Sequence, residues 1–257
     1  MKDYLIKTLD LKAGYDGTPV TGNIELNIRR GEVLTLIGPN GSGKTTLLRT
    51  LSKQLEPVAG TVLLEEEDLQ VVKASELAKR MAVVFSDALR PEQMTCREAV
   101  AVGRYPYTGR FGRLSDEDNV LIEKAMEQVR VKDLSDRLFT AISDGQRQRV
   151  VLARALAQEP EVILLDEPTT FLDIRWKAEF LEALKRLSSE QGLTVVLTLH
   201  EPELARLFSD RVACVKEGRI DRVGTPEEVF EGEYIAELFG MDAKLYERWY
   251  RYAYNIK

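Results

Sequence analysis

Short apolar runs recur along this chain, and they predict the strands of a buried parallel sheet. Strands covered on both faces read as continuous runs of about four to eight apolar residues, rich in Val, Ile and Leu. The runs that fit this pattern are residues 33–37, 81–85, 162–165 and 194–199. An α/β fold with a parallel core sheet is therefore expected.

A second set of segments alternates between apolar and polar residues, which is typical of antiparallel strands with one solvated face. These segments are residues 5–11, 23–28 and 60–64. Because they lie near the N-terminus, they predict an antiparallel β subdomain beside the core sheet.

Between residues 85 and 161 the pattern becomes helical. Ser115 precedes three acidic residues, which indicates the start of a helix. Residues 147–156 contain neither Gly nor Pro and predict a further helix. We expect one domain over 1–257, with a catalytic core and β subdomain at 1–85 and 158–240, a helical subdomain at 86–157 and a C-terminal tail at 241–257.

Composition narrows the class of protein. The 257 residues are 44% hydrophobic and 30% charged, with a net charge of -6, a balance that favours a globular protein and argues mildly against a nucleic-acid partner. No apolar run approaches the roughly 20 residues that span a bilayer, and the N-terminus does not look like a signal segment. Two cysteines, Cys96 and Cys214, make no disulfide framework, so a reduced cytoplasmic setting is expected.

A complete GxxxxGK[ST] phosphate loop follows the run 33–37 and precedes a helix predicted over 45–51. Gly38, Gly41 and Gly43 allow the backbone to approach a phosphate closely. Lys44 can then reach the β and γ phosphates, and the Thr45 hydroxyl can bind Mg²⁺. The alternative is a Gly-rich turn before a helix, but strand, loop and helix stand in the order that a phosphate loop needs.

Two carboxylates follow the run 162–165. Asp166 is expected at the carboxyl edge of the sheet, where ligands bind in open α/β folds, as a ligand of Mg²⁺. Glu167 beside it is the candidate general base for an attacking water. The alternative is a pair of surface carboxylates after a buried strand.

The loop Ser143-Asp144-Gly145-Gln146 makes the pattern specific, because a Ser hydroxyl and a Gly amide before a helix form an anion site. Together with the phosphate loop and Asp166, it resembles the nucleotide-binding subunit of an ABC transporter over nearly the whole chain. The resemblance implies a P-loop NTPase (RecA-like) core, and a head-to-tail homodimer in which this signature loop closes on the ATP held by the partner.

The resemblance extends to three further residues. Tyr15 matches the aromatic residue that stacks on adenine, Asp173 matches the loop that couples the two ATP sites, and His200 matches the switch histidine. Glu167, His200 and Lys44 are thus expected to be catalytic, with Thr45 and Asp166 at the metal. The residues expected to bind ATP are Tyr15, Gly38, Pro39, Asn40, Gly41, Ser42, Gly43, Lys44, Thr45, Thr46, Ser143, Gly145, Gln146 and Asp173.

Two positions depart from the family. Asp144 stands where Gly is usual, and a carboxylate near a phosphate is unfavourable unless it points away. Ser86 stands where a Gln usually contacts the metal and senses the membrane subunit. We expect altered hydrolysis or coupling and intact nucleotide binding, which a kinetic comparison of Ser86→Gln with the parent would test.

The segments 98–107 and 169–174 resemble the importers of iron chelates, haem and cobalamin. In that branch the helical insert receives a cytoplasmic helix of the permease. Arg104 and Tyr105 are candidates for this contact, with local packing as the alternative. In the tail, Tyr246, Trp249 and Tyr250 share a helical face, which could pack on its own domain or meet a dimer partner or the membrane.

The expected function is ATP hydrolysis that powers import of an iron-siderophore, haem or cobalamin-type substrate. The expected cofactors are ATP and Mg²⁺. Expected partners are a second copy of the chain, integral-membrane permease subunits and an extracytoplasmic substrate-binding protein, but no nucleic acid. The chain would lie peripherally at the cytoplasmic face of the membrane. Two alternatives remain: a free-standing ABC ATPase acting on DNA or a soluble partner, and a small-molecule P-loop kinase, which would have no use for the Ser143 loop.

Overall fold

The computed structural model describes residues 4–85, 91–170 and 172–254. Its centre is a six-stranded sheet in the order β12-β11-β5-β10-β9-β8, in which only the β11–β12 pair is antiparallel. The strands of this sheet are β5 (Val33–Ile37), β8 (Met81–Val84), β9 (Val162–Leu165), β10 (Thr194–Thr198), β11 (Arg211–Lys216) and β12 (Arg219–Gly224). The parallel core sheet is confirmed, and the two strands β11 and β12 extend it beyond the sequence prediction.

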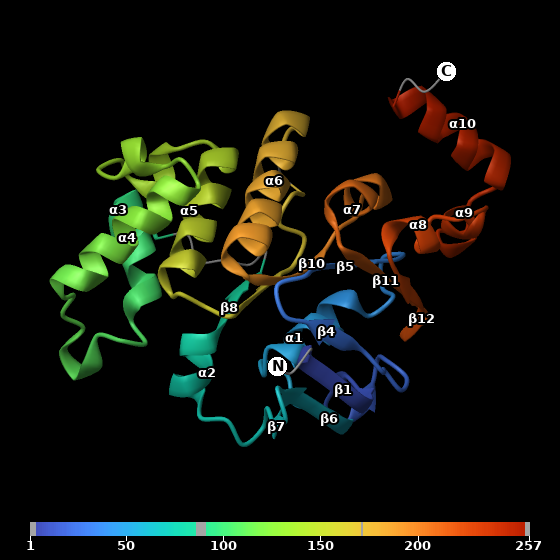
Figure 1. The fold of residues 1–257 in the computed structure, drawn as a ribbon, viewed down its shortest axis with the longest axis horizontal. Coiled ribbons are helices and arrows are strands. Elements are labelled where there is room, and N and C mark those ends of the chain that lie inside the picture. Colours follow the sequence, from blue (N-terminus) through green and yellow to red (C-terminus); the bar gives the residue numbers. More distant parts are fainter. Residues whose placement is uncertain (1–3, 86–90, 171, 255–257) are drawn as a thin grey trace.

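A smaller antiparallel sheet lies beside the core, as the alternating segments predicted (Figure 1). Its order is β4-β1-β6-β7, and helix α1 lies between it and the core sheet. The elements of this part are β1 (Tyr4–Lys12), β2 (Gly14–Tyr15), β3 (Thr18–Pro19), β4 (Asn27–Arg29), α1 (Lys44–Leu51), β6 (Ala59–Leu64), β7 (Glu67–Asp68) and α2 (Ala74–Arg80).

Strand β5 explains how the core is built, because all five of its residues are buried. Leu34 and Leu36 pack with α1 and the antiparallel sheet, whereas Val33 and Ile37 pack on the other face with α6 and the insert helices. The continuous apolar run is thus required by two hydrophobic layers on opposite faces of one sheet.

The chain between β8 and β9 is mostly helical and lies at one end of the molecule (Figure 1). Its helices are α3 (Cys96–Ala101), η1 (Val102–Arg104), η2 (Gly109–Phe111), α4 (Asp116–Gln128), η3 (Lys132–Leu134), η4 (Phe139–Ala141) and α5 (Asp144–Ala157). Capping boxes at Thr95, Ser115 and Ser143 begin the three α-helices. Ser115 confirms the helix start predicted from the sequence.

Arg104 lies inside this insert. Its guanidinium is buried, its Nε bonds to Asp118 Oδ1 at 2.8 Å, and its Nη1 donates to the Ala157 carbonyl at 2.8 Å. Of the two candidates for a permease contact, Arg104 is therefore wrong, because it holds η1 to α4 and α5. Tyr105 beside it is 61% exposed.

The remaining helices cover the core sheet and form the C-terminal end. They are α6 (Ile174–Gln191), α7 (Pro202–Phe208), α8 (Pro226–Val229), α9 (Tyr234–Leu238) and α10 (Ala243–Tyr254). Helix α10 projects at the end of the molecule opposite the insert, with the half-buried Tyr246 packed against the main core (Figure 1). Within the described ranges, every helix is too short or too polar to cross a membrane.

Candidate functional site

The predicted residues meet at one edge of the core sheet because three neighbouring parallel strands end there. Strand β10 lies between β5 and β9, with Thr198 beside Leu36 and Leu197 beside Leu165. The phosphate loop follows β5, Asp166 and Glu167 follow β9, and His200 follows β10. Side chains from three distant parts of the sequence are thereby placed in one cluster.

The phosphate loop has the backbone geometry that its glycines permit. Gly38 has a φ of 150° and Gly43 a φ of 102°. A Cβ added at Gly38 would lie 2.1 Å from the Val215 carbonyl oxygen on β11, so no larger residue fits there. The loop is pressed against the sheet and opens into the N-terminus of α1, where amides and the helix dipole favour an anion.

Two buried polar side chains of the phosphate loop, Lys44 and Ser42, are available to bind a ligand. Lys44 is buried, and its Nζ donates to the carbonyls of Gly38 and Pro39 at 2.8 and 3.0 Å, within its own loop. The Ser42 Oγ is buried and has no hydrogen-bond partner in the described part of the chain. A charged donor and an orphaned hydroxyl at a helix N-terminus fit the oxygens of a phosphate chain.

The surroundings of Lys44 shift the pKa of its ammonium group. Burial lowers the pKa of its ammonium group, and the nearby carboxylates of Glu167 and Asp166 act in the opposite direction. The ammonium group is thus costly to bury without an anionic ligand, which favours binding of a polyphosphate.

Asp166 is fixed by two hydroxyl groups. Its Oδ1 accepts from Thr45 Oγ1 at 3.2 Å and from Thr198 Oγ1 at 2.8 Å. The same Thr198 hydroxyl accepts from the Glu167 amide at 2.8 Å. Buried Thr198 therefore connects the end of β10 to both carboxylate residues, a contact that no sequence pattern predicts.

Glu167 contacts His200 directly. Its Oε2 lies 2.7 Å from His200 Nε2, and Thr170 Oγ1 donates to the same oxygen at 3.4 Å. The Glu167 backbone has a φ of 49°, a left-handed conformation that costs a non-glycine residue energy. The carboxylate is half-exposed at the cluster, where it can meet a water molecule.

No group of three or more His, Cys, Asp or Glu side chains forms a metal site by itself within the described residues. Mg²⁺ needs no such group, because it is usually held by one or two carboxylates together with water and phosphate oxygens. The Thr45 hydroxyl and the Asp166 carboxylate, joined by a hydrogen bond, have the oxygen donors that this ion prefers.

The Ser143 loop begins α5 with a reciprocal cap. The Gln146 amide donates to Ser143 Oγ at 3.3 Å, and Gln146 Oε1 accepts from the Ser143 amide at 3.0 Å. Asp144 forms an ion pair with Arg147 along the same helix. Its carboxylate thus has a local cation, which reduces the repulsion that a bound phosphate would meet.

Other predicted residues stand apart from the cluster. Tyr15 is 41% exposed on the small β2–β3 hairpin, and Asp173 caps α6 by accepting from the Trp176 amide at 3.0 Å. Ser143 and Asp173 are both exposed, and neither is hydrogen-bonded to the phosphate loop in the described structure. Ser86, the position that departs from the family's Gln, lies outside the described residues, as does Asp87.

Comparison with known proteins decides the family. Residues 21–170 match the family model described as ABC transporter. This chain belongs to the ABC transporter family. It is an ABC-type ATPase, and its P-loop NTPase fold, predicted from the sequence, is confirmed.

Curated relatives of this ABC protein match over most of their length. An uncharacterized ABC transporter ATP-binding protein of Methanocaldococcus jannaschii is 43% identical over 92% of this chain and 82% of the relative. The iron(3+)-hydroxamate import ATP-binding protein of Bacillus subtilis is 38% identical over 93% and 89%. The ferric enterobactin transport ATP-binding protein of Escherichia coli is 38% identical over 90% and 85%.

A solved dimeric structure of a bacterial ABC transporter cassette has the same fold as this ABC protein. The two superpose with a TM-score of 0.75 at 29% identity, over 86% of this chain and 98% of the cassette.

Proposed function

We propose that this ABC protein hydrolyses ATP to power import of an iron-siderophore, haem or cobalamin-type substrate through a separate membrane permease. The single observation that carries the ATPase mechanism is the cluster of Lys44, Thr45, Asp166, Glu167 and His200 at the carboxyl edge of β5, β9 and β10. The transported substrate rests on the relatives, which are named for iron-hydroxamate and enterobactin transport. We place the chain peripherally at the cytoplasmic face of the membrane.

In the proposed site, ATP lies across the phosphate loop with its adenine near Tyr15. Lys44 would leave the carbonyls of Gly38 and Pro39 and bind phosphate oxygens instead. The buried Ser42 hydroxyl and the amides of residues 38–46 would complete this contact. Thr45 and Asp166 would hold Mg²⁺, which supplies positive charge to the phosphate oxygens when bound.

Glu167 is the proposed general base. It would accept a proton from a water molecule as that water attacks the γ-phosphate, a role typically worth about 10² to 10⁴ in rate. His200, 2.7 Å away, would hold the Glu167 carboxylate in position. The Thr198 hydroxyl would help to hold Glu167 in this position, because it accepts a hydrogen bond from the Glu167 backbone amide.

We propose that two copies share each ATP. The partner's Ser143, Gly145 and Gln146 would close on the γ-phosphate, and Asp173 would connect the two sites. The exposure of Ser143 and Asp173 on the monomer supports this arrangement, as does the dimeric state of the related cassette. The capped start of α5 offers backbone amides and a hydroxyl to an anion.

We propose an apolar cavity on the insert as the docking site of the permease. Its volume is about 320 Å³, and its lining includes Met94, Ala99, Val102, Tyr105, Phe139 and Val150. An exposed apolar surface of this kind on a polar protein is typical of a protein interface. Tyr105 thus remains a candidate contact, whereas Arg104 is buried within the insert.

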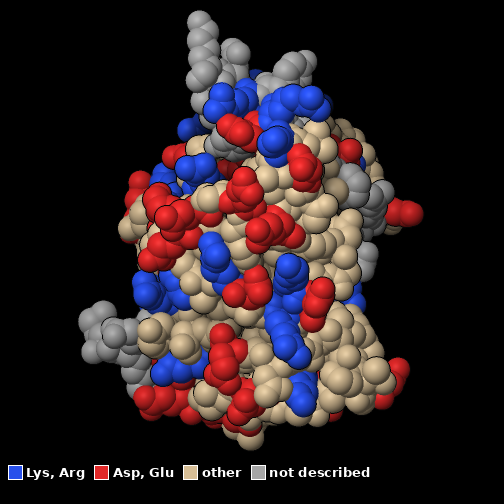
Figure 2. Space-filling view, turned by 90° about the vertical axis from the view of Figure 1, so that its right-hand side faces the viewer, with Lys and Arg blue, Asp and Glu red and all other residues tan. Residues whose placement is uncertain are grey.

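The charge distribution gives no support to the DNA-acting alternative. On the face shown in Figure 2, acidic and basic side chains are interspersed, and no broad basic surface is present there. A phosphate backbone attracts a continuous basic surface.

The shared-site mechanism can be tested by light scattering of the variant Glu167→Gln, which should bind ATP without hydrolysing it. We expect a monomer that becomes a dimer only with Mg-ATP, and we expect Ser143→Arg to abolish the dimer. Ser189→Arg, at an exposed serine on α6, is the matched control and should still dimerise. Dimerisation unaffected by Ser143→Arg would contradict the mechanism.

The transport function needs reconstitution with the candidate permease in vesicles. ATP-driven uptake of a ferric hydroxamate, haem or cobalamin would support the proposal and select among the three substrates. Assembly without ATP-driven uptake of any of them would contradict it.

A further inference from the structure

We propose that Trp176 is a positioning residue that joins the Asp173 loop to the signature loop of the same chain, so that the two move as one unit against the partner's ATP. This inference rests on the proposed shared-site function. Trp176 lies in the first turn of α6, whereas the signature loop begins α5, and the two helices come from different parts of the fold.

The contact between the indole and the signature loop is close. A Cβ added at Gly145 would lie 3.0 Å from Trp176 Cγ and 3.1 Å from its Cδ1. The indole therefore packs directly on the Gly145 backbone, which is buried although the neighbouring Ser143 and Asp144 are exposed. The glycine at this position is needed for the indole as well as for an approaching phosphate.

Asp173 fixes the backbone of the same tryptophan. Its Oδ1 accepts from the Trp176 amide at 3.0 Å as the N-cap of α6. Asp173 is thus bonded to the first turn of α6, which carries the indole that touches Gly145. The two loops are linked through one side chain over a short path.

Two arginines hold the indole from outside. The guanidinium of Arg149, on α5, lies 4.3 Å from the ring centroid, and that of Arg175 lies 5.2 Å from it. Both are within the range of cation–π attraction. Arg175 is held by Glu179 at 2.8 Å, so the ring contacts charged groups from both helices.

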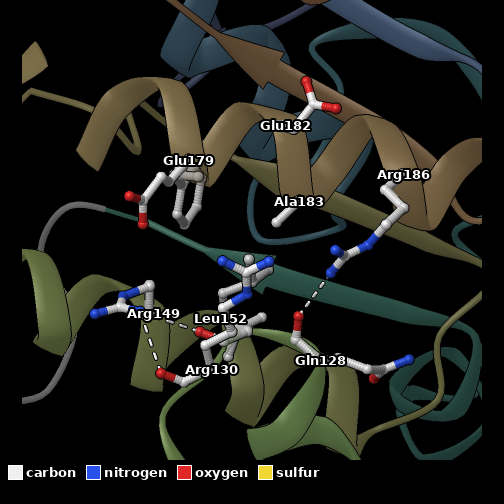
Figure 3. A pocket seen from close by; sticks show the side chains of 10 residues that line it. Gln128, Arg130, Arg149, Leu152, Glu179, Glu182, Ala183 and Arg186 are labelled. Atoms are coloured by element: carbon white, nitrogen blue, oxygen red, sulfur yellow. Dashed lines mark hydrogen bonds between the residues drawn. The ribbon is translucent and has the colours of Figure 1, made fainter. Parts of the chain in front are cut away.

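Arg149 is itself anchored in the insert. Its Nη1 donates to the carbonyls of Val129 and Arg130 at 3.4 and 3.2 Å, and burial lowers the pKa of its guanidinium. Its side chain also lines a cavity of about 100 Å³ between α6 and the insert (Figure 3). This cavity is lined by Arg149 and Leu152 of α5 and by Glu179 and Phe180 of α6, so the two helices pack incompletely beside the contact that Trp176 makes.

Hydrogen exchange of the monomer tests the link without any dimer. We expect Trp176→Ala and Asp173→Ala each to speed exchange at the hydrogen-bonded amides that begin α5, residues 146–149, by about tenfold. Trp176→Phe, which keeps an aromatic ring, should restore most of the protection. Phe180→Leu is the matched control, because Phe180 is buried one turn further along α6 and should loosen the core without affecting this turn. Unchanged exchange at residues 146–149 in Asp173→Ala would overturn the proposal.

ATP-dependent dimerisation of Glu167→Gln then gives the functional readout. With Trp176→Ala added, the ATP concentration for half-maximal dimer should rise about tenfold, while ATP binding to the monomer stays within about twofold of the parent. An equal rise with Phe180→Leu would reduce Trp176 to a merely structural residue and overturn the proposal. If the parent itself fails to dimerise, the shared-site function fails, and the exchange experiment still decides the link between the two loops.

Discussion

Replacing Thr198 by valine removes one hydroxyl group and keeps the shape of the side chain. Thr198 is fully buried at the end of β10, and its Oγ1 makes two hydrogen bonds, to Asp166 Oδ1 and from the Glu167 amide. In the valine variant both groups lose this partner at the edge of the sheet where ATP is proposed to bind.

The loss of stability can be estimated from these two bonds. A neutral hydrogen bond contributes about 0.5–1.5 kcal/mol net, and one to a charged group about 1.5–3 kcal/mol. Thr198→Val should therefore lower the free energy of unfolding by about 2–4 kcal/mol. For a chain of this length, this corresponds to a fall in Tm on the order of 10 °C.

The ATPase activity should fall as well. Glu167 holds a left-handed backbone conformation, with a φ of 49°, and its amide bond to Thr198 supports that conformation. Without it the residue can relax and move its carboxylate away from His200. We expect kcat to fall at least about tenfold, a fraction of the contribution of a general base.

Thermal unfolding and steady-state ATP hydrolysis of the purified protein measure the two effects. Thr194→Val is the matched control, because Thr194 is a buried threonine at the other end of β10 that accepts from the Gly31 amide. This control should lose some stability and keep its kcat. If Thr198→Val retains the parent's Tm and kcat, Thr198 does not organise the two carboxylates.

Three further changes test other parts of the fold. Burial raises the pKa of the Glu203 carboxyl group, so the folded protein binds the carboxyl proton more tightly than the unfolded chain does. The free energy of unfolding therefore falls as pH rises through the pKa of the folded state. Glu203→Gln should therefore have a higher Tm than the parent at pH 8, and this difference in Tm should vanish near pH 4. A difference in Tm that is the same at both pH values would refute the reasoning. Arg104→Met leaves the buried Asp118 without its ion-pair partner and should lower the free energy of unfolding by about 3–5 kcal/mol in urea. A decrease below about 1 kcal/mol would contradict the role of this ion pair in stabilising the insert. Gly38→Ala places a Cβ against the Val215 carbonyl and should weaken ATP binding in calorimetry by more than about tenfold, whereas unchanged affinity would show that the loop tolerates a side chain.

The centre of the site was readable from the sequence because the parallel strands were visible as apolar runs. Asp166 and His200 come directly after two of these strands, and Lys44 follows the glycine-rich loop after a third. The start of α4 was readable for a similar reason, because capping at Ser115 depends on residues close in sequence. Strand β11 was not predicted, since two of its four apolar residues are Ala213 and Cys214, and Arg211 and Lys216 bound the run.

The sequence alone determined the family, the phosphate loop and the residues that follow each strand, because these depend on local spacing. Only the tertiary structure decided which of them are neighbours. The placing of β10 between β5 and β9 brings Thr198 to Asp166 and His200 to Glu167, and the packing of α6 on α5 brings Trp176 to Gly145. For Arg104 the sequence left a permease contact and local packing open, and the structure shows local packing, because Asp118 on α4 and the Ala157 carbonyl on α5 both bond to its guanidinium. Contacts of this kind depend on the order of the strands and the angles between helices, which no local pattern encodes.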